Sequence, residues 1–271
     1  MTDKVSEHYT HGSLLEAIRA GVEGLGKTPD TVSVHDLGPV DEFHIGGRAA
    51  SESFLEQLAL SSTEHVLDVG CGLGGASRLV AERFGSRVSG IDLTHEYVET
   101  GSVLCSWVGL SDLVELQQGS ATAMPYKDNT FDKAYMMHVG MNIADKRQLL
   151  SELSRVLKPN ARLGIYDVMK TSEDALAFPV PWASTVETSF VESPTVYKQV
   201  LEDAGFRLIA ERNRREFATE FFAAVSAGGK GPPPLGLHIL MGAARGEKVK
   251  NMIENISAGR IAPVELIAEK N

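Results

Sequence analysis

The sequence has little of several features that mark special classes of protein. Among its 271 residues there are only two cysteines, Cys71 and Cys105, and their spacing is not that of a zinc site. Neither a disulfide framework nor a metal site is therefore expected. No apolar run reaches the roughly 18 residues that a membrane span needs, and the first residues lack the apolar core of a signal peptide. We expect a soluble, cytoplasmic protein without a membrane span.

Basic residues are scarce as well. The chain has 26 Lys and Arg against 36 Asp and Glu, which gives a formal net charge of -10. Binding a nucleic-acid backbone requires a concentrated basic surface, and no basic stripe is visible. The expected partner is therefore a small molecule and not a nucleic acid. Hydrophobic residues make up 43% of the chain, enough for the core of one α/β enzyme domain, and a homodimer is compatible with this composition.

The most informative feature that is present is DVGCGLGG at residues 68–75. A buried strand leads into it and a helical pattern leaves it. Gly70, Gly72 and Gly74 remove the Cβ atoms that would keep a ligand away from the backbone. The next strand ends at Asp92, whose carboxylate can accept hydrogen bonds from both hydroxyls of a ribose. This arrangement predicts a nucleoside site in an α/β sheet.

Two cofactors could use such a glycine loop, and Asp68 separates them. Gly70, Gly72 and Gly75 also fit G-x-G-x-x-G, the dinucleotide fingerprint, which is a weak signal alone. A carboxylate at Asp68 would repel a pyrophosphate, whereas S-adenosylmethionine carries an ammonium and a sulfonium and no phosphate. A structural alternative is that Asp68 only caps the turn. Charge favours S-adenosylmethionine, and an NAD-dependent oxidoreductase is the outside alternative.

Residues 64–170 resemble the class I S-adenosylmethionine-dependent methyltransferases, especially the small-molecule group that includes the ubiquinone and menaquinone C-methyltransferases. Four motifs in order carry the resemblance: DVGCGLGG (68–75), GIDLT (90–94), MPYKDNTFD (124–132) and LLSELSRVLKPNARLGIYD (149–167). The resemblance implies an α/β fold with a Rossmann-like sheet, mostly parallel with an antiparallel edge strand, and helices on both faces. It also implies S-adenosylmethionine as cofactor and S-adenosylhomocysteine as product.

The resemblance places the cofactor contacts after the first four strands of the sheet. They are Asp68, Gly70, Gly72, Gly74, Asp92, Leu93, Ser120, Ala121 and His138. The glycines would line the methionine part, Asp92 would bind the ribose and Leu93 would pack on the adenine. Family members often hold the adenine amino group with an aspartate where this chain has Ser120, whose hydroxyl can accept the same hydrogen bond without charge.

A looser resemblance reaches both ends of the chain. DEFHIGGR (41–48), DVMK (167–170) and short pieces near residues 251–260 are similar to the sarcosine/dimethylglycine N-methyltransferases. It points to N-methylation of an amine such as sarcosine or dimethylglycine. The carboxylate of such an acceptor must be neutralised in the pocket. The cations expected near the site are Arg48, Lys170, Arg214 and Arg215.

The alternative reaction is C- or O-methylation of a quinol or a phenolic metabolite. Carbon and oxygen nucleophiles need a general base. The candidate catalytic residues are His138 after the fourth strand, Asp167 after the fifth, and His44 in the loop before the first strand. His138 and Asp167 also have a simple structural use in hydrogen bonding to nearby backbone, and His44 with Gly46 and Gly47 resembles the family's loop that closes over the methionine end of the cofactor.

Two inserts are expected to frame the site. Residues 171–193, with Trp182 and Phe190, form one candidate wall. A Gly- and Pro-rich run at 228–234, which is typical of a hinge, and a helical pattern over 235–256 suggest a lid.

The predicted organisation has four parts: an N-terminal helical and loop cap at 1–60 with a turn at 36–39, a core at 61–213, a helical lid insert at 214–260 and a final edge strand at 261–271.

Overall fold

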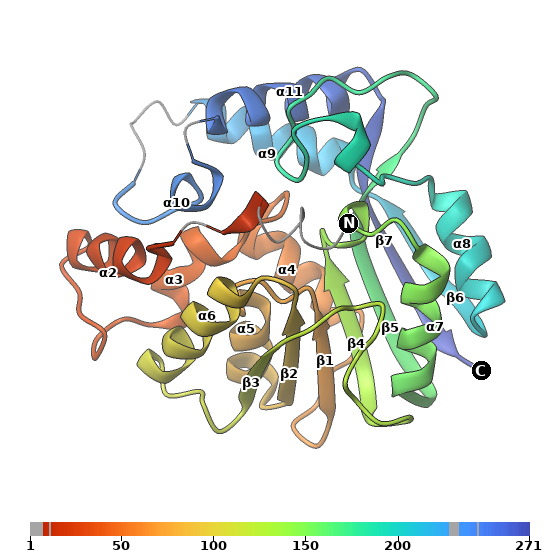
Figure 1. The fold of residues 1–271 in the computed structure, drawn as a ribbon, viewed down its shortest axis with the longest axis horizontal. Helices are drawn as coiled ribbons and strands as arrows, with labels where there is room; N and C mark the ends of the chain where they lie inside the picture. Colours follow the sequence, from red (N-terminus) through yellow and green to blue (C-terminus); the bar gives the residue numbers. More distant parts are fainter. Residues whose placement is uncertain (1–7, 11, 228–232, 243) are drawn as a thin grey trace.

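A seven-stranded sheet organises the chain, as the computed structural model shows for residues 8–10, 12–227, 233–242 and 244–271 (Figure 1). The strands are β1 (His65–Val69), β2 (Arg87–Asp92), β3 (Val114–Gln118), β4 (Phe131–Met137), β5 (Leu157–Lys170), β6 (Phe206–Asn213) and β7 (Ile261–Lys270). Their spatial order is β3-β2-β1-β4-β5-β7-β6. The pairs from β3 to β5 are parallel, so the expectation of a mostly parallel sheet is confirmed.

The antiparallel strand is β7, and it lies one place in from the edge. It pairs with β5 on one side and with β6 on the other, so the edge strand is β6 and the prediction of an edge strand at 261–271 is wrong. The first eight residues of β7 are all buried. A strand that is covered on both faces in this way belongs inside a sheet and not at its rim.

Helices cover both faces of the sheet, as expected. On one face α7 (Lys146–Val156) and α8 (Pro194–Asp203) bury a cluster that includes Leu67. On the other face, three helices bury a second cluster that includes Val66. They are α4 (Gly47–Glu56), α5 (Gly75–Phe84) and α6 (His95–Trp107). Neighbouring residues of β1 thus point to opposite faces, as the strand repeat requires.

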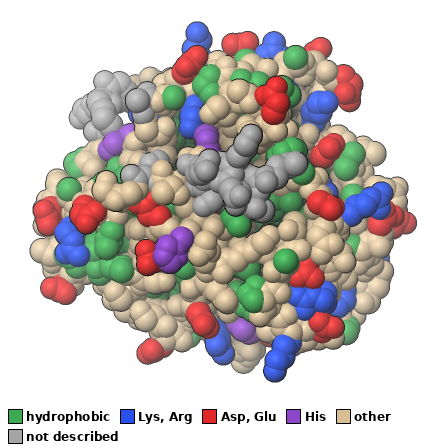
Figure 2. All heavy atoms as spheres, in the orientation of Figure 1, with side chains coloured by type: hydrophobic (Ala, Val, Ile, Leu, Met, Phe, Trp, Pro, Cys, Tyr) green, Lys and Arg blue, Asp and Glu red, His purple; other side chains and the backbone are tan. Residues whose placement is uncertain are grey.

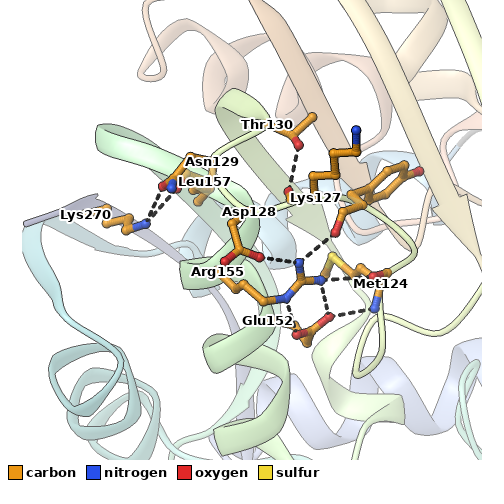
Figure 3. A network of polar contacts seen from close by, with 10 residues as sticks. Met124, Lys127, Asp128, Asn129, Thr130, Glu152, Arg155, Leu157 and Lys270 are labelled. Atoms are coloured by element: carbon orange, nitrogen blue, oxygen red, sulfur yellow. Dashed lines mark hydrogen bonds and ion pairs between the residues drawn. The ribbon is translucent and has the colours of Figure 1, made fainter.

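Two of the motifs that carry the family resemblance meet at Arg155 (Figure 3). Its guanidinium donates to the carbonyl oxygens of Tyr126, at 2.6 Å, and Met124, at 3.0 Å. It also pairs with Asp128 at 2.9 Å and with Glu152 at 2.7 Å. These contacts hold the loop before β4 against α7, so this part of the family motif stabilises the fold at a distance from the site described below.

The N-terminal part contains two helices, α2 (Leu14–Gly24) and α3 (Val34–Asp41). The second replaces the turn predicted at 36–39, which is wrong. Ser33 and Asp36 form a capping box: the hydroxyl of Ser33 accepts from the amide of Asp36, and the carboxylate accepts from the amide of Ser33. Because Leu37 is buried, packing and capping outweigh the turn preference of Gly and Pro here.

Two helices lie side by side above the end of the sheet in Figure 1, α9 (Arg215–Ala227) and α11 (Arg245–Ser257), and the short α10 (His238–Met241) lies beside α2. The single helical pattern predicted over 235–256 is therefore wrong, because the chain breaks at Gly242, whose φ is +64°. Most of the predicted hinge at 228–234 lies outside the described residues. A lid that moves stays a prediction.

Charges of both signs are interspersed on the face shown in Figure 2, without a large patch of one sign. In the described parts of the chain, none of the helices combines the length and the apolar character needed to cross a bilayer.

Candidate functional site

A cavity of about 800 Å³ opens where the parallel strands end. Its floor is formed by the loops after β1 to β4, and its walls come from residues 38–48, from the segment with Trp182 and from α9 to α11. A volume of this size is typical of ligand sites. The position is also the one at which open α/β sheets bind ligands.

The glycine loop gives this floor its shape. Gly70 and Gly72 have φ values of +70° and +53° and line the cavity. A Cβ atom on Gly72 would meet nothing closer than Tyr97 at 3.9 Å, so its backbone faces open space. Gly74 is different: it caps α5, a Cβ there would lie 2.8 Å from Leu116, and it is not among the cavity-lining residues. Its predicted contact with the cofactor is therefore not supported by its position.

Asp92 lies at the end of β2 and is held by the backbone. Its Oδ2 accepts from the amide of Gly72 at 2.9 Å, and its Oδ1 accepts from the amide of Thr94 at 2.8 Å. Burial raises the pKa of Asp92, and these amides oppose the rise. A carboxylate has about four acceptor positions, so two remain for ribose hydroxyls. Together with the open backbone at Gly72, these residues fit S-adenosylmethionine.

Asp68 lies below the same loop. It is 3% exposed, lines the cavity and accepts a hydrogen bond from the Ser77 hydroxyl at 2.6 Å. Burial raises its pKa to about 6, against the effect of that hydrogen bond. At neutral pH the carboxylate is mostly ionised, which suits a cationic ligand and opposes a pyrophosphate.

The predicted adenine side is also assembled. Leu93, Ser120 and Ala121 all line the cavity after β2 and β3. The Ser120 hydroxyl accepts from the amide of Thr122 at 3.2 Å and lies 2.9 Å from the Thr122 hydroxyl. The loop is thus fixed locally, with a hydroxyl at the place where family members often have a carboxylate.

His138 follows β4 in a left-handed conformation, with φ at +57°. Such conformations are uncommon for residues other than glycine and cluster at functional sites. Its Nε2 accepts a hydrogen bond from the amide of Ile45 at 3.3 Å, so Nδ1 carries the hydrogen of the neutral ring. Burial and the nearby His44 hold the pKa of His138 well below its usual range. His138 therefore lines the cavity as a neutral imidazole.

His44 belongs to a polar cluster beside His138, with ring centres 5.8 Å apart. Its Nε2 lies 2.8 Å from Oε2 of Glu42 and 2.9 Å from the hydroxyl of Ser51. Arg48 Nε lies 2.8 Å from the other carboxylate oxygen, Oε1. Glu42, His44 and Arg48 line the cavity. The sequence pattern indicated His44 but not Glu42 and Ser51, although both lie close to His44 in the sequence.

Asp167 does not reach the cavity. It is fully buried and accepts hydrogen bonds from the Tyr197 hydroxyl at 2.6 Å and from the amide of Val168 at 3.0 Å. Burial raises its pKa to about 6, opposed by Tyr197 and Lys146. Because Asp167 is not among the cavity-lining residues, its position does not support the predicted catalytic role and indicates a structural one.

The cations expected for an anionic acceptor are mostly elsewhere. Lys170 pairs with Glu173 at 3.2 Å, Arg214 lies 3.5 Å from Glu265, and Arg215 donates to backbone carbonyls at the end of α11. None of the three lines the cavity, so this expectation is wrong for them. Arg48 does line it, but its charge is paired with Glu42.

The upper part of the cavity is apolar. Its side chains come from the loop after β4, from the predicted wall at 171–193 and from α9 and α11, and they are Met141, Trp182, Phe190, Phe221, Phe222 and Met252. The wall prediction named Trp182 and Phe190, and both line the cavity. The residues of α9 and α11 that line the cavity could not be predicted, because an apolar helix face is equally typical of a buried core.

Comparison with known proteins identifies the central part of the chain. Residues 67–165 match a family described as "Methyltransferase domain". A probable chloroplastic tocopherol O-methyltransferase of Oryza sativa subsp. japonica is 45% identical over 48% of this chain, which spans only 38% of that protein. Methyltransferase GfsG of Streptomyces halstedii is 29% identical over 76% of this chain and 73% of its own.

The fold is found in solved structures as well. A putative sarcosine dimethylglycine methyltransferase from Galdieria sulphuraria superposes with a TM-score of 0.69, with 94% of this chain and 98% of that chain covered. The sequences are 18% identical, so this likeness concerns the fold.

Proposed function

The chain contains a class I, S-adenosylmethionine-dependent methyltransferase domain, and from this premise we propose that it transfers a methyl group to carbon or oxygen of an apolar small molecule, such as a quinol or a phenolic metabolite. The observation that carries the proposal is the group of apolar side chains in the upper cavity, which line the same cavity as the loops that fit the cofactor. Burying an aromatic or isoprenoid-like acceptor against these side chains would supply much of its binding energy. The name of the rice relative, a tocopherol O-methyltransferase, agrees with this reaction type.

N-methylation of sarcosine or dimethylglycine is less well supported by the site. Such an acceptor carries a carboxylate, and burying it without a partner is very costly. Of the described cavity-lining residues, only Arg48 and Arg245 carry a full positive charge, and Arg48 is already paired with Glu42. Of the four cations expected from the looser resemblance to amino-acid N-methyltransferases, none supplies a free charge to the cavity, and Arg245 is left as the one lining cation among the described residues that could meet a carboxylate.

The chain's contribution to the reaction is placement and exclusion of water. Asp92 and the backbone at Gly72 would hold the ribose and methionine ends of the cofactor, with Asp68 supplying a compensating charge. When bound, S-adenosylmethionine supplies an activated methyl group. The aromatic wall must hold the acceptor's nucleophilic atom about 3 to 3.5 Å from that group and in line with it. Loss of the acceptor's proton then requires a base in the cavity.

A panel of acceptors tests the proposal. The full chain is incubated with S-adenosylmethionine and, separately, a short-chain quinol, 1-naphthol, sarcosine and dimethylglycine, and the methylated product is identified by mass spectrometry. We expect methylation of the quinol or the naphthol and none of the two amino acids. Methylation confined to the amino acids would contradict the proposal.

A further inference from the structure

We propose that His44 is the residue that takes the proton from the methyl acceptor, and that Glu42 is the positioning residue that holds it in the required form. The inference rests on the proposed function, because only an acidic O–H or C–H acceptor needs a base. Both side chains are 6% exposed and both residues line the cavity. They lie between α3 and α4, outside the 67–165 segment that matches the family, so the base would come from the N-terminal part of the chain.

Glu42 determines which nitrogen of His44 carries the hydrogen. An ionised carboxylate only accepts hydrogen bonds, and Oε2 of Glu42 lies 2.8 Å from Nε2 of His44. The Ser51 hydroxyl donates to the same oxygen at 2.5 Å, so it meets Nε2 through its own oxygen at 2.9 Å. Both neighbours therefore require a hydrogen on Nε2. The lone pair of the neutral ring is left on Nδ1.

Glu42 is ionised at neutral pH, as this assignment requires. Burial alone would raise its pKa, but the hydrogen bonds from His44 and Ser51 and the charge of Arg48 oppose burial, and the pKa lies below its usual value. A buried negative charge at 2.8 Å also stabilises the imidazolium that forms when His44 accepts a proton. The other titratable groups around the ring are His138 at 5.8 Å and Tyr166 at 6.0 Å between ring centres.

The peptide of Ile45 distinguishes His44 from His138. Nδ1 of His44 lies 3.5 Å from the carbonyl oxygen of Ile45, which can only accept, so this long contact becomes a hydrogen bond once Nδ1 has taken up the proton and then stabilises the imidazolium. In His138 the two nitrogens have the opposite roles: Nε2 carries the lone pair, which accepts the amide hydrogen of Ile45, and Nδ1 carries the hydrogen. His44 can therefore accept a proton, whereas His138 presents a hydrogen and has its lone pair in use.

The hydrogen positions can be tested without any acceptor. The full chain is labelled with ¹⁵N-histidine, long-range ¹H–¹⁵N spectra are recorded with S-adenosylhomocysteine bound, and His44→Gln assigns the ring. We expect an Nε2-protonated His44, and a mixed or Nδ1-protonated ring in Glu42→Gln. The matched control Glu56→Gln, on an exposed glutamate of α4, should leave the spectrum unchanged. An Nδ1-protonated His44 in the wild type would overturn the proposal.

The catalytic role is tested by single-turnover rates with whichever of the quinol and 1-naphthol is methylated. We expect His44→Gln to lower the rate by about 10² to 10⁴ and Glu42→Gln by about tenfold or more, while S-adenosylhomocysteine affinity by calorimetry changes less than about threefold. The control His95→Gln, on an exposed histidine, should be unaffected. A wild-type rate in His44→Gln would overturn the base. No turnover of either acceptor would contradict the proposed function instead, and the spectra would still decide the arrangement of Glu42 and His44.

Discussion

The backbone amide of Gly72 donates a hydrogen bond to Oδ2 of Asp92 at 2.9 Å, which joins the loop after β1 to the end of β2. The other oxygen of Asp92 accepts from the amide of Thr94, so both ends of the carboxylate are fixed. The acid is thereby held in one orientation by backbone groups that do not depend on side-chain packing. Preorganisation of this kind reduces the entropic cost of binding a ligand.

Asp92→Ala should therefore weaken cofactor binding. A charge-assisted hydrogen bond contributes about 1.5 to 3 kcal/mol, which corresponds to roughly 10- to 100-fold in affinity. Calorimetric titration with S-adenosylhomocysteine measures the change, and Asp112→Ala, an exposed aspartate outside the cavity, is the control. Unchanged affinity in Asp92→Ala, or tighter binding of NAD than of S-adenosylhomocysteine by the wild type, would contradict the assignment.

Asp167→Asn should retain methyl transfer, because the Asp167 side chain is buried away from the cavity. It should also unfold at equal or higher denaturant concentration above pH 6. The pKa of Asp167 is about 6 in the folded state against an ordinary 3.8, so its ionisation costs folding stability above pH 6. This difference corresponds to at most roughly 3 kcal/mol, reduced by the lost attraction to Lys146.

The gain in Asp167→Asn should shrink as the pH falls from 6 towards 4 and vanish below about 3.8, where the carboxyl is largely protonated in both folded and unfolded chains. Urea unfolding of both proteins at pH 7.5 and pH 4 measures it. A large loss of methyl transfer in a variant of normal stability would instead assign Asp167 a direct role in catalysis.

His138 should make the protein less stable in acid. Its pKa is held well below the usual value in the folded state, whereas the unfolded chain takes up a proton near pH 6.5. The unfolded state thus binds more protons below pH 6.5, and the free energy of unfolding falls by up to about 1.4 kcal/mol per pH unit. His138→Gln should lose less stability than the wild type between pH 7.5 and pH 5.5. Equal losses in urea unfolding would show that His138 is not buried as a neutral ring.

Most of the sheet could be predicted from the sequence because its signals are local. The strand at 65–69, the glycine loop and the strand ending at Asp92 appear where the pattern placed them. The place of β7 could not be predicted, since IAPVELIA is compatible with a buried strand at several positions of a sheet. Which strands lie beside it depends on contacts between segments that are distant in sequence.

The candidate site also has one part that the sequence predicts and one that it does not. The floor residues follow strands in consecutive order, so their meeting at one edge follows from the topology. The cluster of Glu42, His44 and Ser51 could not be derived, because its position over the cavity depends on how α3 and α4 pack. The orientation of Asp167 could not be predicted for a related reason: the end of a strand was predictable, but not the hydroxyl of Tyr197 that holds its side chain inside the core.

The apolar wall should set the choice of methyl acceptor. Phe221 and Phe222 of α9 line the cavity with ring centres 5.3 Å apart, and neither makes part of the floor that fits the cofactor. Replacing a fully buried aromatic side chain by alanine costs several kcal/mol of packing free energy. Because these rings are only partly buried in the protein alone, we expect Phe222→Ala to raise KM for the quinol or 1-naphthol by roughly tenfold, about 1.4 kcal/mol. The affinity for S-adenosylhomocysteine should stay within about threefold of wild type.

The matched control for this variant is Phe84→Ala, at the end of α5 and outside the cavity, which should leave KM unchanged. A rise in KM that grows with the apolar area of the acceptor across a series of alkyl-substituted phenols would identify Phe222 as a contact of the acceptor. If Phe222→Ala weakened cofactor binding as much as acceptor binding, α9 would act on the whole cavity and not on acceptor choice. If neither changed, the acceptor would lie on the other wall, against Trp182 and Phe190.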